Sequence, residues 1–256
     1  MTVVNWLNFL RKRTVRGVRR VSRDARPALQ MQSETLEPRC LLTTIDLAAL
    51  VAGQGTTIFG VGVGDYSGIS VSSAGDVNGD GFDDLLIGAV NGDAAGNLKS
   101  GAGDSYVIFG GAALSGTIDL AVLDEAGVTI FGADAGDGSG RSVSSAGDVN
   151  GDGFDDLLIG AVGAGAAGNL KGFAGDSYVI FGGADLPATI NLAVLGEAGV
   201  TIFGAGAGDN SGRSVSSAGD VNGDGFDDLL IGAVSADGAG DLKVSAGDSY
   251  TSRGEE

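Results

Sequence analysis

The chain has 256 residues and a formal net charge of −18, with 48 glycines, no histidine and a single cysteine, Cys40. The lack of histidine excludes Ser-His-Asp and Cys-His catalysis and histidine-ligated metals, and a single cysteine excludes an intramolecular disulfide. An acidic chain repels nucleic acid, so neither DNA nor RNA is an expected partner.

The first 43 residues differ from the rest in charge. Residues 1–43 contain nine Arg or Lys against three Asp or Glu, a net charge of +6, so the remainder carries −24. Short apolar patches precede the arginines, the reverse of the order in a signal peptide, and no stretch is long enough to cross a membrane. We expect residues 1–43 to be a disordered or helical basic leader.

The leader ends in the segment Glu34-Thr-Leu-Glu-Pro-Arg-Cys-Leu-Leu-Thr43. This segment resembles the LEPR-XLL motif found near the N-termini of surface or exported proteins of planctomycete bacteria. The resemblance is confined to these residues and implies a secreted or surface-displayed protein. The alternative is a basic arm that contacts acidic surfaces.

Beyond the leader, one pattern recurs with a period of 72 residues. The string SVSSAGDVNGDGFDDLLIGAV begins at Ser70, Ser142 and Ser214. A fixed period indicates units that bury their cores against their neighbours. The third copy breaks off before the VIFGG that ends the other two. Residues 44–256 are therefore divided into three repeats: 44–115, 116–187 and 188–256, the last one truncated.

Each repeat contains four short segments with the composition of β-strands. In the first repeat these segments are 57–60, 70–74, 84–90 and 105–110. The last two are almost continuously apolar, as expected for a sheet that is covered on both faces, and the small residues of the second suit an inner strand near a crowded axis. Residues 119–127 are predicted to form one helical turn. The fold is therefore predicted to be all-β.

A nine-residue loop, D-V-N-G-D-G-F-D-D, follows the second strand of every repeat. Side-chain oxygens at loop positions 1, 3, 5 and 9 and the backbone carbonyl at position 7 form an all-oxygen set, which calcium accepts in loose geometry. Glycine at position 6, such as Gly81, permits a sharp reversal. The expected cofactor is calcium, about three ions and one per repeat. The candidate ligands are Asp76, Asn78, Asp80, Phe82 and Asp84, then Asp148, Asn150, Asp152, Phe154 and Asp156, then Asp220, Asn222, Asp224, Phe226 and Asp228.

Position 12 of the loop separates it from two helical calcium motifs. An EF-hand has a bidentate Glu at this position and a dockerin has Asp or Asn, whereas this chain has Ile87, Ile159 or Ile231 in strand-like sequence. The remaining alternative is an Asx and glycine turn that binds no metal. Converging carboxylates repel each other without a cation, which favours metal binding. The position-8 residues are expected to face solvent and not to bind the metal: Asp83, Asp155 and Asp227.

The order of these motifs resembles the FG-GAP repeat of integrin α-subunits and many bacterial surface proteins. The shared features are the FG dipeptide, the D-x-N-x-D-G-x-x-D loop, G-A-V in place of G-A-P, and the G-x-x-Y-V strand, over roughly residues 44–250. The resemblance implies a β-propeller-like array of three four-stranded blades, the last incomplete, with calcium in a hairpin loop. That family closes a ring of more blades than three, so we expect open blade edges and self-association through them.

These features predict a calcium-binding, integrin-like repeat protein that is secreted or displayed at the cell surface and acts in adhesion or as a structural scaffold. Its expected partners are calcium and an extracellular protein or polysaccharide ligand, with no nucleic acid and no membrane span. No residue pair stands apart from the repeated pattern as acid and base, so no enzyme activity is expected. The alternative is a fragment or accessory propeller domain of an extracellular hydrolase.

Overall fold

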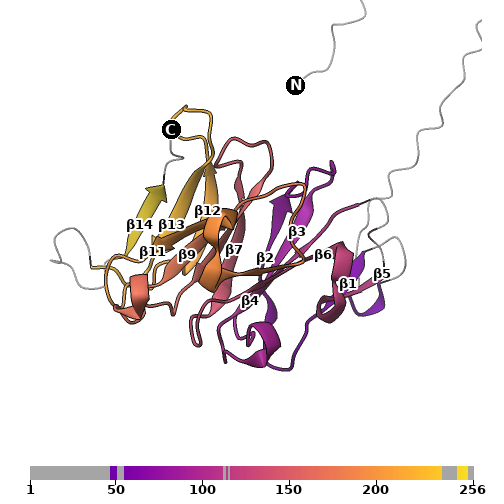
Figure 1. Ribbon diagram of the computed structural model, residues 1–256, viewed down its shortest axis with the longest axis horizontal. Helices are drawn as coiled ribbons and strands as arrows, with labels where there is room; N and C mark the ends of the chain where they lie inside the picture. Colours follow the sequence, from indigo (N-terminus) through magenta and orange to yellow (C-terminus); the bar gives the residue numbers. More distant parts are fainter. Residues whose placement is uncertain (1–46, 51–54, 112–113, 115, 238–246, 253–256) are drawn as a thin grey trace, which may run out of the picture. The chain divides into compact units, whose positions relative to one another are not determined.

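The computed structural model describes residues 47–50, 55–111, 114, 116–237 and 247–252. The predicted leader, with its LEPR-XLL-like motif, lies outside these residues. The described part is all-β, as predicted: its strands form one two-stranded sheet and three larger sheets, joined by loops and short 3-10 helices (Figure 1). No helix within it has the length and apolar character needed to span a membrane.

The three larger sheets follow one another along the chain. Their strand orders are β10-β6-β4-β3-β2, β11-β9-β8-β7 and β12-β13-β14, and neighbouring strands are antiparallel except for β10, which is parallel to β6. The first sheet contains β2 (Ser67–Gly75), β3 (Asp84–Ala89), β4 (Asp104–Ile108), β6 (Gly127–Phe131) and β10 (Thr189–Asn191). The second contains β7 (Ser139–Gly147), β8 (Asp156–Ala161), β9 (Asp176–Ile180) and β11 (Gly199–Phe203). The third contains β12 (Ser214–Gly219), β13 (Asp228–Ala233) and β14 (Asp248–Ser252).

The helical turn predicted at residues 119–127 forms as two 3-10 helices in succession, η3 and η4. Asp119 begins η3, because its carboxylate accepts a hydrogen bond from the backbone N–H of Ala121 at 3.0 Å. The third repeat has the same arrangement, with Asn191 in the capping position. The 3-10 helices are η1 (Leu47–Ala49), η2 (Ala95–Asn97), η3 (Leu120–Val122), η4 (Asp124–Ala126), η5 (Ala167–Asn169), η6 (Leu192–Val194) and η7 (Gly196–Ala198).

The outer strand of a sheet comes from the next repeat, which differs from the grouping expected from the sequence. The segment at 57–60 was expected to join the other strands of its own repeat, but β1 (Thr56–Phe59) pairs in parallel with β5 (Gly116–Asp119). The equivalent strands β6 and β11 pair with β4 and β9 of the preceding repeat. In both cases the strand that follows directly in the chain pairs elsewhere, β5 with β1 and β10 with β6, and the strand after it completes the preceding sheet.

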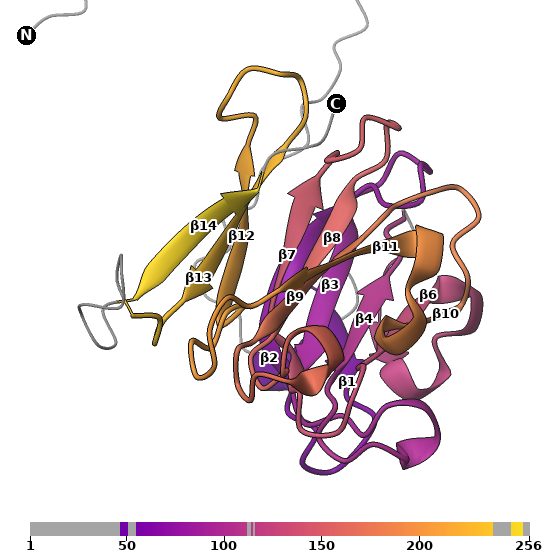
Figure 2. The same cartoon turned by 60° about the vertical axis from the view of Figure 1, so that its left-hand side comes forward.

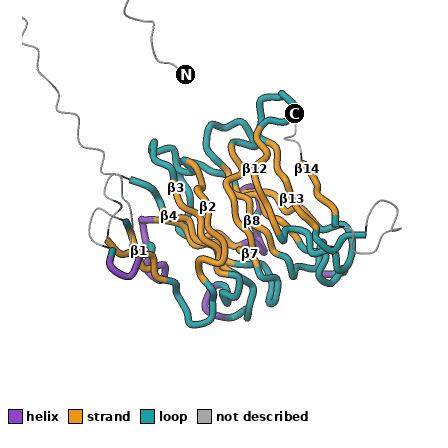
Figure 3. Tube along the Cα trace, turned by 180° about the vertical axis from the view of Figure 1, so that it is seen from behind, coloured by secondary structure: helices purple, strands orange, loops and turns teal. Residues whose placement is uncertain are grey.

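The three sheets lie side by side, with their first strands β2, β7 and β12 in succession (Figures 2 and 3). Serine side chains connect neighbouring sheets here, strand to strand or to the segment just before β12. The N–H of Val143 donates to Ser70 Oγ at 3.0 Å, and Ser142 Oγ donates to the carbonyl of Gly212 at 2.7 Å. A bulkier residue would separate the backbones, so the small residues of the repeated SVSSA segment allow this close approach, as predicted for inner strands.

The hydrophobic core lies mainly between adjacent sheets. One buried cluster joins the first two sheets and includes Val77, Leu86, Val143 and Ile180. A second cluster, with Leu158 and Leu229, joins the second sheet to the third. Each repeat therefore completes its core with side chains of its neighbour, which is the arrangement expected for a repeat protein.

Candidate metal centre

The nine-residue loop links the first two strands of each of the three larger sheets, and its position-1 residue makes the same hydrogen bonds in all three repeats. At position 1, Asp76 Oδ1 accepts from the N–H groups of Gly79 at 2.8 Å and Asp80 at 3.0 Å, and Oδ2 accepts from Gly81 at 2.9 Å. Asp148 and Asp220 make the corresponding three bonds at 2.6–3.2 Å. The position-1 carboxylate therefore determines the path of the loop around itself.

Positions 3 and 5 complete this local pattern. Asn78 Oδ1 accepts from the N–H of Asp80 at 2.9 Å, and Asp80 Oδ1 accepts from the N–H of Phe82 at 2.9 Å. The Asn78 amide donates to Asp80 Oδ2 at 3.2 Å. Gly81 has φ +88°, a conformation that favours glycine, so the glycine expected at position 6 is required by the turn. Positions 1, 3 and 5 therefore lie close together, as the sequence predicted.

Position 9 lies beneath the loop, in the core. Asp84, Asp156 and Asp228 are fully buried. Asp84 Oδ2 accepts from the N–H of Val77 at 3.0 Å and Oδ1 from the N–H of Gly110 at 2.7 Å, so this side chain connects the loop to the end of β4. Asp156 makes the same two bonds in the second repeat, and Asp228 accepts from Val221 in the third.

The loops concentrate negative charge. Burial raises the pKa of Asp156 to about 6, with smaller contributions from the nearby carboxylates of Asp152 and Asp148. Burial also raises the pKa of Asp84, again with a contribution from the two acidic residues above it. At Asp220, partial desolvation favours the protonated form, but the backbone N–H groups that the carboxylate accepts from outweigh it and lower the pKa.

Part of the predicted ligand set fits a hard cation. The side chains at positions 1, 3 and 5 can bind a metal only through oxygen atoms. These oxygens accept hydrogen bonds from the backbone but keep further lone pairs that a cation could use. At position 9, Asp84 and Asp156 each accept from two backbone N–H groups instead, and Asp228 accepts from the N–H of Val221 and the amide of Asn222. Among the described residues no group of three or more acidic, histidine or cysteine side chains is placed to hold a metal ion. The donor chemistry therefore suits calcium, whereas a closed ligand cage is not formed.

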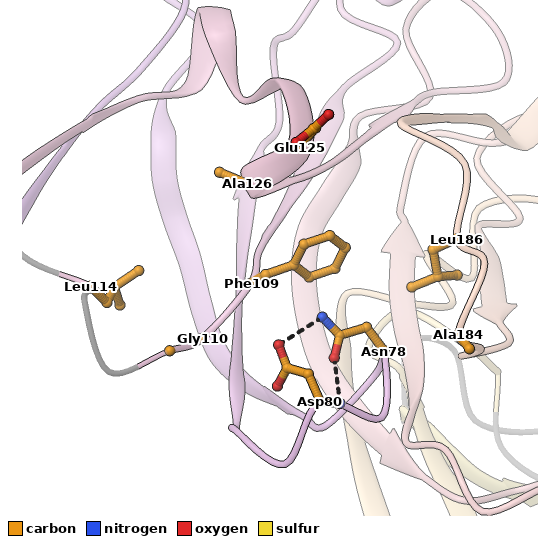
Figure 4. A pocket seen from close by; sticks show the side chains of 10 residues that line it. Asn78, Asp80, Phe109, Gly110, Leu114, Glu125, Ala126, Ala184 and Leu186 are labelled. Carbon is orange, nitrogen blue, oxygen red and sulfur yellow. Dashed lines mark hydrogen bonds between the residues drawn. The ribbon is translucent and has the colours of Figure 1, made fainter.

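Solvent reaches the first loop through an open hollow of about 610 Å³ (Figure 4). Asn78 and Asp80 line one side of it, and Phe109, Glu125 and Leu186 line other parts of its wall. Figure 4 shows Asn78 beside Asp80 with Glu125 further away, across the hollow. The hollow is open to solvent, and its wall combines two carboxylates and an amide with apolar surface. A cation or a polar ligand can therefore enter it and find polar groups to bind.

Positions 7 and 8 have a role that the sequence did not reveal. Asp155 and Asp227 were expected to face solvent, but Asp155 Oδ2 accepts a hydrogen bond from the N–H of Asp76 at 2.8 Å, and Asp227 Oδ2 accepts from that of Asp148 at 3.1 Å. Each reaches the loop of the preceding repeat. Asp83 is exposed, as expected.

The position-7 phenylalanines make the same kind of contact. A Cβ atom added to Gly79 would lie 2.5 Å from the ring of Phe154, and one added to Gly151 would lie 2.5 Å from the ring of Phe226. In the first two loops the ring of the next repeat therefore leaves no room for a side chain at position 4, where a positive φ already favours glycine. The only signal in the sequence is that both residues recur with the period of the loop.

Comparison with known proteins gives three matches to the FG-GAP repeat, at residues 67–108, 139–180 and 211–251. Each match runs from the first to the third strand of one sheet. The chain is 29% identical to integrin alpha-PS5 of Drosophila melanogaster over 78% of its length, and 31% identical to integrin alpha pat-2 of Caenorhabditis elegans over 66%. It is 30% identical to the phosphatidylinositol-glycan-specific phospholipase D of Dictyostelium discoideum over 70%. It spans 18%, 13% and 19% of these relatives, respectively.

Proposed function

The chain contains three FG-GAP repeats in integrin-like, propeller-type blades, and on this premise we propose that it is a calcium-binding protein of the cell surface or the extracellular space, active in adhesion or as a scaffold. One observation carries the proposal: the three acidic loops share one hydrogen-bonded conformation, in which positions 1, 3 and 5 bring only oxygen donors together. Calcium is the common cation that accepts such a set in irregular geometry.

In this proposal Asp76, Asn78 and Asp80, with their equivalents in the other repeats, hold the ion. The ion neutralises the carboxylates that otherwise repel each other, and so stabilises the hairpin between the first two strands. Because the position-1 residue is also bonded to the next repeat, an ion in the loop stabilises the junction between two sheets. Affinities of about 10⁻⁴–10⁻³ M, typical of extracellular modules, fill the sites outside a cell.

Calcium binding is tested by equilibrium dialysis and by thermal melting with calcium, magnesium or EDTA. We expect about three calcium sites, and at ten times Kd a stabilisation of about 1.4 kcal/mol per site. The position-5 side chains are exposed, so replacing them should leave the fold intact. Each of three variants is expected to remove one calcium site: Asp80→Asn, Asp152→Asn and Asp224→Asn. Asp83→Asn is the matched control, because it changes an exposed acidic residue at position 8. An unchanged number of sites in the three position-5 variants contradicts the assignment.

A second candidate function is supported by the match to a phospholipase D. In that case the chain is an accessory propeller domain of an extracellular hydrolase. The absence of histidine from the whole sequence supports the non-enzymatic proposal, because it removes the usual general base. Purified full-length chain is assayed on phosphodiester, ester and glycoside substrates. Turnover that a single substitution outside the loops abolishes contradicts the non-enzymatic proposal, and no turnover agrees with a chain that has no chemistry of its own, whether as a scaffold or as an accessory domain.

A further inference from the structure

The two junctions between the larger sheets are formed by equivalent residues. They therefore show which residues each face of a sheet contributes to a junction. At the first junction, Asp155 accepts from the N–H of Asp76, the ring of Phe154 lies on Gly79, and Val143 enters the buried cluster that contains Leu86. At the second junction the equivalent contacts are made by Asp227 on Asp148, Phe226 on Gly151, and Val215 in the cluster of Leu158. We call the two sides of a junction the leading face, which supplies Asp, Phe and Val, and the trailing face, which supplies the backbone N–H, Gly and Leu.

The leading face of the first sheet consists of Val71, Phe82 and Asp83. All three are exposed: Val71 by 67%, whereas Val143 at the same place in the second sheet is exposed by 6%. Phe82 is 46% exposed. Within the described residues the leading face of the first sheet makes none of the contacts that its equivalents make in the other two.

The trailing face of the third sheet consists of Asp220, Gly223 and Leu230. Leu230 is 40% exposed, whereas Leu86 and Leu158 are fully buried at the same place in the other sheets. A Cβ added to Gly223 would meet no described atom within 4 Å, although the corresponding positions of the other two loops lie against phenylalanine rings. Val221 shows the same difference, being 64% exposed where Val77 is fully buried. In the part of the chain that the structure describes, this face also has no counterpart.

We propose that a second copy of the chain supplies the missing counterpart, and that the copies associate with the leading face of one on the trailing face of the other. Asp83 then accepts from the backbone N–H of Asp220, Phe82 lies on Gly223, and Val71 packs against Leu230. The same residue types already meet at both internal junctions, so the contact extends an interface that this chain forms twice within itself. A contact of this kind is complementary in shape, in apolar surface and in hydrogen bonding.

Two copies joined at both pairs of faces form a closed ring. Each copy supplies three sheets, and a ring of six lies within the range of about four to eight blades in which propellers close. A closed two-fold ring leaves neither face open, whereas a single contact leaves one of each. The inference goes beyond the calcium-binding function, because the proposed contacts involve no metal.

The oligomeric state of the full-length chain tests the proposal, by light scattering after size exclusion and by sedimentation. Wild type is expected to be a dimer. Val71→Arg and Leu230→Arg each place a charge in one of the two faces, so each variant is expected to be a monomer. Both side chains are exposed within the chain, so the fold is retained and circular dichroism checks this. Val194→Arg is the matched control, since Val194 is 76% exposed outside both faces, and this variant remains a dimer.

Mixing the two variants tests the head-to-tail direction. A V71R copy keeps its trailing face and an L230R copy keeps its leading face, so an equimolar mixture forms a one-to-one dimer through the intact pair. The double variant V71R/L230R has neither face and remains a monomer with either partner. A monomeric wild type, a wild-type mass that V71R and L230R leave unchanged, or a mixture that stays monomeric overturns the proposal.

Discussion

The carboxylate of Asp155 accepts a hydrogen bond from the backbone N–H of Asp76, with 2.8 Å between N and Oδ2, although the two residues are 79 positions apart. The N–H of Asp155 in turn donates to the carbonyl of Asp76 at 3.3 Å. Asp227 and Asp148 repeat this exchange at the next junction. The acidic loop of one repeat is therefore held by the following repeat, so local loop geometry and the packing of sheets are coupled.

We first predict that Asp155→Ala destabilises the protein more than Asp83→Ala. Loss of the Asp155 carboxylate leaves the partly buried N–H of Asp76 without its acceptor, at a cost of about 1–3 kcal/mol. Asp83 is exposed in the first repeat, and its substitution changes stability by less than about 0.5 kcal/mol. Urea denaturation monitored by circular dichroism measures the difference in the free energy of unfolding. Each substitution is made separately in the V71R background, so that copies do not associate. Equal costs contradict the prediction.

A second prediction compares two glycines at loop position 4. Gly79 and Gly223 have φ of +76° and +80°, so alanine is strained by a similar amount at both. Only at Gly79 does the added Cβ meet the Phe154 ring. With both substitutions made in the V71R background, so that no second copy covers Gly223, Gly79→Ala is therefore expected to lower the free energy of unfolding by about 1–3 kcal/mol more than Gly223→Ala. Adding Phe154→Ala should remove the excess, which a double-mutant cycle detects; additive effects exclude a direct clash.

The third prediction concerns equivalent leucines in the second and third sheets. Leu158 is fully buried between sheets and Leu230 is 40% exposed. Leu158→Ala leaves a cavity and is expected to cost about 2–5 kcal/mol, whereas Leu230→Ala removes a partly hydrated side chain and costs less than about 1 kcal/mol. The melting temperatures of the two variants show which substitution destabilises the protein more. They are measured in dilute protein so that copies do not associate. The reverse order argues against the burial of Leu158 at the junction.

The fourth prediction is a rise in stability on mild acidification. Burial raises the pKa of Asp104 and of Asp137 to about 6, above about 3.9 in the unfolded chain. Between these pH values the folded state binds more protons than the unfolded state, so stability increases as the pH falls from about 6 toward 4 and is level above that range. Melting in EDTA is compared for wild type and Asp104→Asn/Asp137→Asn.

The asparagine pair does not titrate, so its melting temperature is expected to rise less than that of wild type between pH 7 and pH 5. EDTA prevents calcium binding from adding its own pH dependence. Other carboxylates titrate in both proteins and cancel in the comparison. Identical pH profiles would show that the two buried carboxylates keep an ordinary pKa in the folded protein.

The sequence was sufficient for features that depend on residues close together along the chain. The all-β class, the strands at 70–74 and 84–90, and the convergence of Asp76, Asn78 and Asp80 were all predictable, because the hydrogen bonds that shape the loop connect residues at most five positions apart. The inner position of the SVSSA strand also followed from composition, since only small side chains allow backbones to approach so closely.

The sequence by itself thus determined the strands, the period and the conformation of each acidic loop. The tertiary structure alone decided that β6 and β11 complete the preceding sheet, because a repeat with a period of 72 residues has the same sequence pattern wherever the unit is taken to begin. It alone separated Asp83 from Asp155, since identical local sequences surround both and, among the described residues, only the second contacts a neighbouring sheet. The difference lies in the neighbour, and a neighbour 79 residues away is set by the packing of sheets, not by local preference.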